Sequence, residues 1–186
     1  MIIKQKPITD FSSDFVELAK SIADCNYNVN FDARTFFFQS EHCLFTVNDL
    51  RKIFSDKVNT SCNQEYCSIG TQDHQKKPCI RGTMKTNTYS SAKNEIDDAL
   101  SFDLELSDSF LANKPTEAAI QIIIDRKQKF WTIIHHYYAV QSATQVLAHE
   151  ASSDSFFGCG IMWQFCFIFI NDKTNQGLVL DGFSYD

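Results

Sequence analysis

The sequence predicts an α+β domain in which N-terminal amphipathic helices pack on a C-terminal antiparallel β-sheet, meander-like and curved. Three observations support this fold class. Apolar residues recur at helical spacing near the N-terminus, and β-rich runs separated by short polar breaks fill the last third. The chain has 186 residues, of which 44% are hydrophobic, so it can bury one sizeable core. We therefore expect residues 1–186 to form a single domain.

Two helices are expected in the first third of the chain. From Phe11 to Asp24, apolar side chains recur every three or four residues, and Ser12 or Ser13 can cap the helix. From Val47 to Lys57, an apolar stripe follows Thr46, a suitable N-cap residue. Both segments are typical of helices that cover one face of a sheet.

The middle of the chain has a different composition. Residues 58–94 are rich in Asn, Thr, Ser, Gln, Lys and Cys and have few large aliphatic residues, so they predict a long polar excursion. Ser91 to Leu100 can form a helix, and Phe102 to Leu106 alternates as a half-buried strand does. Earlier in the chain, Thr35 to Phe38 is aromatic and β-branched, which favours either a brief strand or an irregular segment packed into the core.

The last third is expected to form a meander of strands. The segments are Ala118–Ile124, Lys129–Val140, Thr144–Glu150, Cys159–Asn171 and Gly177–Phe183. Asp125–Gln128 and Asp172–Asn175 are short polar breaks typical of hairpin connections, which force neighbouring strands to be antiparallel. The uninterrupted apolar run Phe165–Ile170 indicates a central strand covered on both faces.

Composition excludes several classes of protein. The net charge of −6 disfavours a general nucleic-acid binder, which needs a basic surface. The most apolar stretch, residues 158–170, is shorter than the roughly 20 residues of a membrane-spanning helix. The first residues contain no apolar signal segment, so we expect a cytoplasmic protein. Seven cysteines are an odd number, which favours free thiols or metal ligands over a complete disulfide framework.

The polar excursion contains a candidate zinc site. Cys62, Cys67, His74 and Cys79 have the spacing C-x4-C-x6-H-x4-C. Four such ligands can hold Zn²⁺ tetrahedrally and supply folding free energy that this apolar-poor segment lacks. The pattern is loosely similar to zinc-knuckle sites, although its first two intervals are longer. Zinc, the one cofactor expected, would be structural; the alternative is that three thiols and an imidazole share this segment without a metal.

An acidic stretch follows a basic one. Residues 74–93 carry five basic residues and no carboxylate, whereas residues 94–113 carry six acidic residues and no base. The acidic residues are Glu95, Asp97, Asp98, Asp103, Glu105 and Asp108. They can dock on a basic surface of a partner protein and accelerate its capture. The alternative interpretation is a solvated helix face followed by a strand with acidic outward positions.

A ligand pocket is the other candidate site. His135 and Tyr137, on one face of the strand expected there, can join Trp163 in lining an apolar cavity with a few polar groups. The alternative is that these residues are ordinary sheet residues. The common phosphate-binding, nucleophile-elbow and metalloprotease motifs do not occur, so we assign no catalytic residue and favour a protein that is not an enzyme.

Two functions follow from these observations. The first is a cytoplasmic protein-binding domain that neutralises or regulates a partner protein. In its small size, acidity and lack of motifs, the chain resembles bacterial toxin-immunity proteins. The alternative is a ligand-binding or hydrolytic domain with a pocket between helices and a curved sheet, an arrangement that resembles the nuclear-transport-factor-2-like superfamily.

Overall fold

The sheet is the largest element of the fold. The computed structural model describes residues 4–5, 17–20, 28–38, 45–54, 82–102, 115–150 and 161–185. Within these residues six strands form one antiparallel sheet in the order β1-β2-β6-β5-β4-β3. The strands are β1 (Lys4–Gln5), β2 (Asn28–Phe37), β3 (Thr83–Asn87), β4 (Gln145–Glu150), β5 (Ile161–Asn171) and β6 (Gln176–Tyr185).

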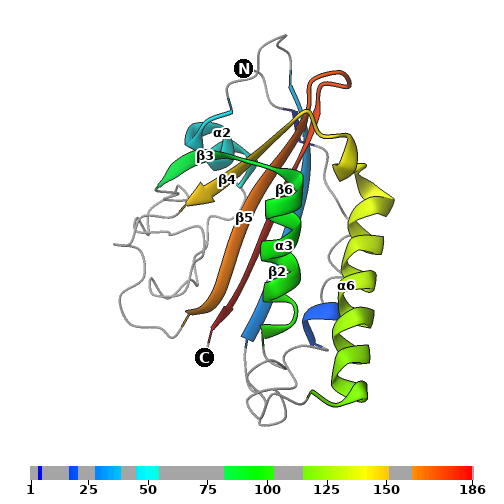
Figure 1. The fold of residues 1–186 in the computed structure, drawn as a ribbon. Helices are drawn as coiled ribbons and strands as arrows, with labels where there is room; N and C mark the ends of the chain where they lie inside the picture. The colour runs from blue at the N-terminus through cyan, green and yellow to red at the C-terminus, as the bar shows by residue number, and fades with distance from the viewer. Residues whose placement is uncertain are drawn as a thin grey trace.

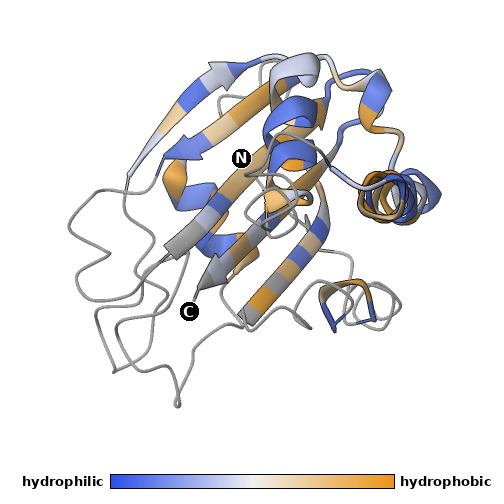
Figure 2. Ribbon diagram, turned by 60° about the horizontal axis from the view of Figure 1, so that its bottom comes forward, coloured by the Kyte–Doolittle hydropathy of each residue, from blue (hydrophilic) through white to orange (hydrophobic). Residues whose placement is uncertain are grey.

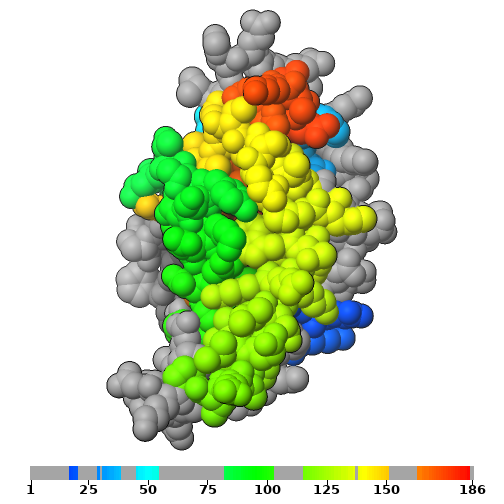
Figure 3. Space-filling model, turned by 45° about the vertical axis from the view of Figure 1, so that its right-hand side comes forward, coloured from blue at the N-terminus to red at the C-terminus, as the bar shows by residue number. Residues whose placement is uncertain are grey.

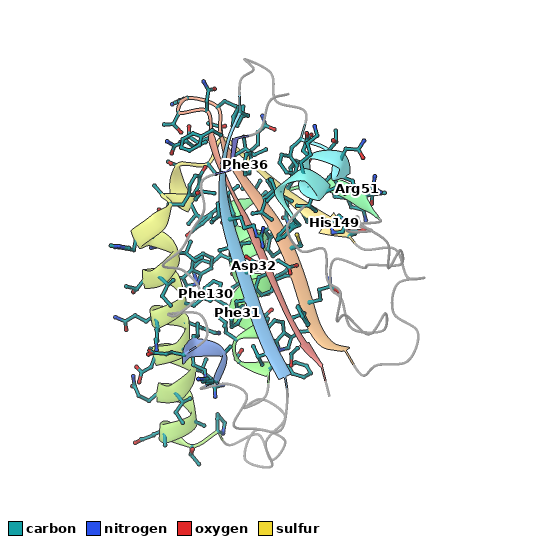
Figure 4. The ribbon with its side chains drawn as sticks, turned by 180° about the vertical axis from the view of Figure 1, so that it is seen from behind. Phe31, Asp32, Phe36, Arg51, Phe130 and His149 are labelled. Carbon is teal, nitrogen blue, oxygen red and sulfur yellow. The ribbon has the colours of Figure 1, made fainter. Side chains whose placement is uncertain are left out.

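Helices cover both faces of this sheet (Figure 1). Helices α3 (Tyr89–Ala99) and α6 (Glu117–Tyr137) lie on one face, together with the helical residues 17–20. The short helix α2 (Val47–Ile53) lies on the other face of the sheet. Figure 4 shows the molecule and this helix from the side opposite to that of Figure 1. A 3₁₀ turn, η1 (Val140–Ser142), connects α6 to β4. The expected α+β class is therefore confirmed.

Strand β5 is buried on both faces. Its residues from Phe165 to Ile170 are each at most 5% exposed. Phe165, Phe167 and Phe169 point into the core under α3 and α6, whereas Cys166, Ile168 and Ile170 belong to the core under α2. A strand between two helix layers needs apolar side chains on both of its faces. The prediction that the run Phe165–Ile170 is a central strand covered on both faces is therefore confirmed.

Helix α6 replaces two of the expected strands. The predictions of strands at Ala118–Ile124 and Lys129–Val140, and of a hairpin break at Asp125–Gln128, were wrong. One helix spans residues 117–137, and Thr116 caps it by accepting a hydrogen bond from the Ala119 amide at 3.2 Å. Seen end-on in Figure 2, the helix has both hydrophobic and hydrophilic residues around its circumference.

The β-rich run that predicted the first of these strands consists largely of isoleucines that do not enter the core. Ile120, Ile122 and Ile124 are 42%, 44% and 49% exposed. The buried side of α6 instead contains residues at helical spacing, such as Phe130 and Ile134.

The other elements agree with the sequence to different degrees. The expected helix at Val47–Lys57 is present as α2, and that at Ser91–Leu100 is present as α3. The polar excursion ends earlier than expected, because β3 and the first half of α3 occupy residues 83–94. The aromatic segment at residues 35–38 largely belongs to the ten-residue strand β2.

Several other expectations can be compared only in part. The expected hairpin at Asp172–Asn175 joins β5 to β6. Most of the helix expected at residues 11–24 and of the strand expected at residues 102–106 lies outside the described residues. Among the helices that the structure describes, none combines the length and apolar character needed to cross a bilayer.

Gly177 allows a close approach between β6 and β2. It pairs with Phe36, and a β-carbon built on Gly177 would lie 2.1 Å from Phe36 Cζ. The Phe36 ring is fully buried among Phe38, Phe45 and the residues of α2, so it has little freedom to move away.

We expect Gly177→Ala to reduce the free energy of unfolding by about 1–3 kcal/mol, because the added methyl group overpacks this core. Urea denaturation followed by circular dichroism would measure the change. Thr174→Ala, at an exposed position of the β5–β6 turn, is the control and should change stability by less than about 0.5 kcal/mol. Equal stability of the two variants would contradict the close approach.

Candidate functional site

The residues of the three predicted sites are distributed as follows. The candidate zinc ligands Cys62, Cys67, His74 and Cys79 lie outside the described residues. Of the six acidic residues, Glu95, Asp97 and Asp98 lie on α3, whereas Asp103, Glu105 and Asp108 lie outside the described residues. In the part of the chain that the structure describes, no group of three or more His, Cys, Asp or Glu residues is arranged to hold a metal ion.

Asp97 connects α3 to α6 and is not a free surface charge. Its Oδ1 accepts a hydrogen bond from Trp131 Nε1 at 2.7 Å, and its Oδ2 forms an ion pair with Lys93. The Lys93 ammonium also lies 5.3 Å from the centre of the Trp131 ring, within the range of a cation–π interaction. Because Asp97 is engaged in this contact, fewer of the six predicted acidic residues are available at the surface than the sequence suggested.

His135 lies one turn beyond this contact, on the outer side of α6. Its ring centroid is 5.9 Å from that of Trp131, and Gln141 Nε2 lies 2.8 Å from His135 Nε2. Partial burial lowers the pKa of His135 below its usual value of 6.5, and the positive charge of Lys93 lowers it further. The neutral imidazole is therefore favoured in the folded protein.

Trp163 has a different set of neighbours from His135. It stacks on Phe31 with ring centroids 5.8 Å apart and on Phe165 at the same distance, between the sheet and α6. Phe31 in turn contacts Phe130 of α6 at 5.4 Å (Figure 4). Trp163 thus belongs to an aromatic cluster at the edge of the core. The side chain of Tyr137 lies outside the described part of the chain.

A cavity of about 390 Å³ lies in a different place, where β4 and β5 diverge. Pairing between these strands ends at Ala148 and Phe167, whereas β4 remains paired with β3 as far as Glu150. Figure 1 shows the two strands separating. The cavity lies in this opening, and Glu95 of α3 contributes to its lining. The cavity therefore lies between a helix and the sheet, but the two expected pocket residues whose side chains are described, His135 and Trp163, do not line it.

The lining of the cavity combines polar groups with an apolar floor. Lys85 and Glu150 form an ion pair, and both side chains are more than half exposed. Phe165 and Phe167 of β5 border the cavity with their ring centroids 5.9 Å apart, but the two side chains are only 5% and 1% exposed. This combination is typical of small-ligand sites. The sequence contained no local signal for it, because the opening depends on where strand pairing ends.

A polar row crosses the opposite face of the sheet. Strand pairing aligns Asp32, Asp181 and Cys166 on neighbouring strands, and Asp181 and Cys166 are almost completely buried. Beside this row Arg34 forms an ion pair with Asp32 and donates a hydrogen bond to the Ile53 carbonyl at 3.0 Å. A buried thiol aligned with a carboxylate lacks the exposed electropositive surroundings of reactive cysteines, so we assign it no nucleophilic role.

Comparison with known proteins adds little to this description. No protein-family model matches the chain, and no curated protein matches it. Two crystal forms of citrus MAF1 are similar in backbone, with 11% and 9% sequence identity and a TM-score of 0.40 each. Each alignment covers 90% of this chain and 98% of the other. A likeness at this level carries no argument about what this protein does.

The contact between Trp131 and Asp97 should contribute measurably to stability. Trp131→Phe removes the indole donor and leaves a largely buried carboxylate with one partner fewer, so we expect a loss of about 1–3 kcal/mol. Chemical denaturation would measure it. Asp98→Asn, at the exposed neighbouring position, is the matched control. A loss no larger than that of Asp98→Asn would show that the hydrogen bond is unimportant.

His135 should make stability depend on pH. The pKa of His135 is lower in the folded protein than in the unfolded chain, so protonation of this imidazole favours unfolding. As far as His135 is concerned, the protein is therefore most stable above about pH 6.5, where the imidazole is neutral in both states, and it loses stability as the pH falls below that value. We expect the unfolding midpoint of the wild type to fall between about pH 7.5 and about pH 5.5 more steeply than that of His135→Gln. Gln141→Ala, which retains the imidazole, should keep the wild-type slope. Equal slopes for wild type and His135→Gln would refute this assignment.

Proposed function

We propose that this protein is a non-enzymatic, cytoplasmic binding domain that regulates or neutralises a partner protein, and that it binds this partner through the outer surface of α3 and α6. The observation that carries the proposal is the exposure of Ile120, Ile122 and Ile124, which are 42–49% exposed. Ile120 and Ile124 are four residues apart and share one side of α6, whereas Ile122 points to another side. Exposed large apolar residues that share one side of a helix are a common feature of protein-binding surfaces.

The charges near these isoleucines favour a partner with basic residues. Glu95 and Asp98 on α3, and Glu117 and Asp125 on α6, are exposed carboxylates. Of the basic residues of the two helices, Lys93 pairs with Asp97, Lys129 pairs with Glu17 and Arg126 is buried, and the others are Lys127 and the two histidines of α6. Helix α6 thus offers apolar contact area, while the exposed carboxylates attract basic groups around it.

The two helices lie next to each other on one side of the molecule. Figure 3 shows α3 and α6 as adjoining parts of a single broad face. The contact of Trp131 with Asp97 joins them in the free protein, so the two helices need not be brought together when a partner binds. A surface that is already assembled loses less conformational entropy on association, which favours affinity.

A site-specific photo-cross-linker provides a test in the native host cell. Placed at Ile124, it should give one defined cross-linked protein, whereas the same group at Thr174 in the β5–β6 turn should not. The purified partner should then bind the wild type at least about tenfold more tightly than the Ile120→Ser, Ile124→Ser double variant. Identical cross-linking at both positions, or unchanged affinity of the double variant, would overturn the proposal.

Charge reversal tests the electrostatic part separately. Asp98→Lys should slow association with the same partner about threefold to tenfold at low salt, with little effect at high salt. Stopped-flow measurements at two salt concentrations would show the difference, and Thr174→Lys is the control for the added charge. An association rate that does not respond to Asp98→Lys would remove the acidic residues from the binding surface.

A small-ligand-binding function is the second candidate, and the cavity between α3 and the diverging strands favours it. A volume of about 390 Å³ is within the usual range for ligand sites. The cavity is lined from three strands and one helix, so its shape depends on the folded core. A binding protein with such a cavity can respond to a metabolite, and the two functions are compatible.

A further inference from the structure

We infer that the cavity between α3, β3, β4 and β5 binds a small organic cation, a primary amine with an apolar body. This inference rests on the second of the two functions proposed above, because it requires that the cavity accept a ligand.

Lys85 and Glu150 form an ion pair at the cavity. Lys85 is the register partner of Ala148, so Lys85 and Glu150 are diagonal neighbours on one face of the β3–β4 pair. Their ion pair leaves this part of the cavity nearly neutral. The ammonium of Lys85 is therefore already engaged and offers little attraction to an anionic ligand.

Glu95 of α3 also lines the cavity. Its Oε1 accepts hydrogen bonds from Ser91 Oγ at 3.3 Å and from Asn87 Nδ2 at 3.5 Å, and both donors are neutral. Within the described part of the chain, no base forms an ion pair with this carboxylate. With Lys85 and Glu150 paired, the cavity has one negative charge in excess, and Glu95 carries it.

His149 of β4 borders the cavity as well. It pairs with Met84, and the side chain of Met84 packs against the core under α2. Residues that face each other on paired strands lie on the same side of a sheet, so the imidazole points away from α3 and Glu95. It therefore does not neutralise the charge of Glu95.

Apolar residues line the cavity on the face of the sheet beneath α3: Phe165, Phe167 and the small Ala148. Phe165 and Phe167 are 5% and 1% exposed, so only Ala148 and a small part of the aromatic surface are open to a ligand. A short apolar body can rest there while an ammonium group reaches Glu95. An anionic ligand would meet the excess negative charge, and a neutral one would gain only the apolar contact.

Three probes of similar shape test the inference: 2-phenylethylamine, 2-phenylethanol and 3-phenylpropionate. Titrated into the full-length ¹⁵N-labelled protein, the amine should shift the amide resonances of cavity residues such as Asn87 and Ala148 and bind more tightly than the alcohol. The carboxylate should bind most weakly. Added salt should weaken binding of the amine and leave that of the alcohol nearly unchanged.

Variants at single carboxylates assign the charge. Glu95→Gln should weaken binding of the amine about threefold to tenfold without affecting the alcohol, whereas Glu117→Gln on α6 should change neither. Equal affinity for amine and alcohol, or no response to Glu95→Gln and to salt, would overturn the inference while leaving a ligand-binding cavity. No shift of cavity resonances with any probe would overturn both this inference and the second proposed function.

Discussion

The structure depends on the burial of β5 between two helix layers. Phe165, Phe167 and Phe169 fill one core and Cys166, Ile168 and Ile170 fill the other, so one strand contributes to both. β6 pairs with β5 along nearly its whole length and also contributes to both cores. Because all other described strands are arranged around this hairpin, loss of its packing would remove the support for both helix layers.

The contacts of α6 with the β5–β6 hairpin and with α3 determine where the candidate surfaces lie. The hydroxyl of Tyr138, just after α6, donates a hydrogen bond to the Gln176 carbonyl at 3.1 Å and anchors the helix end to the β5–β6 hairpin. Burial, with the nearby Asp172, raises the pKa of Tyr138, so the hydroxyl keeps its proton. Trp131 attaches the middle of α6 to α3 through Asp97. Ile120, Ile122 and Ile124, in the N-terminal half of α6, are left exposed on a helix that is fixed elsewhere.

The candidate binding features differ in how visible they are in the sequence. The acidic residues of α3 were recognisable as a charge pattern, but only packing shows that Asp97 is engaged with Trp131, 34 positions away. The isoleucines of α6 predicted a strand because β-branched residues are enriched in strands, and their exposure became apparent only with the helix. The cavity was not recognisable at all, since Lys85, Glu95 and Glu150 come from three separate elements.

Local sequence was sufficient for the α+β class, for the helices α2 and α3 and for the double burial of β5, because these features follow from periodicity and apolar runs within single segments. Tertiary structure decided the rest. Residues 117–137 became helix because a helix buries Phe130, Trp131 and Ile134 against the sheet and α3, which a strand of that sequence cannot do. Where β4 leaves β5, and hence where the cavity opens, depends on strand register between segments far apart in the chain, and no local pattern records it.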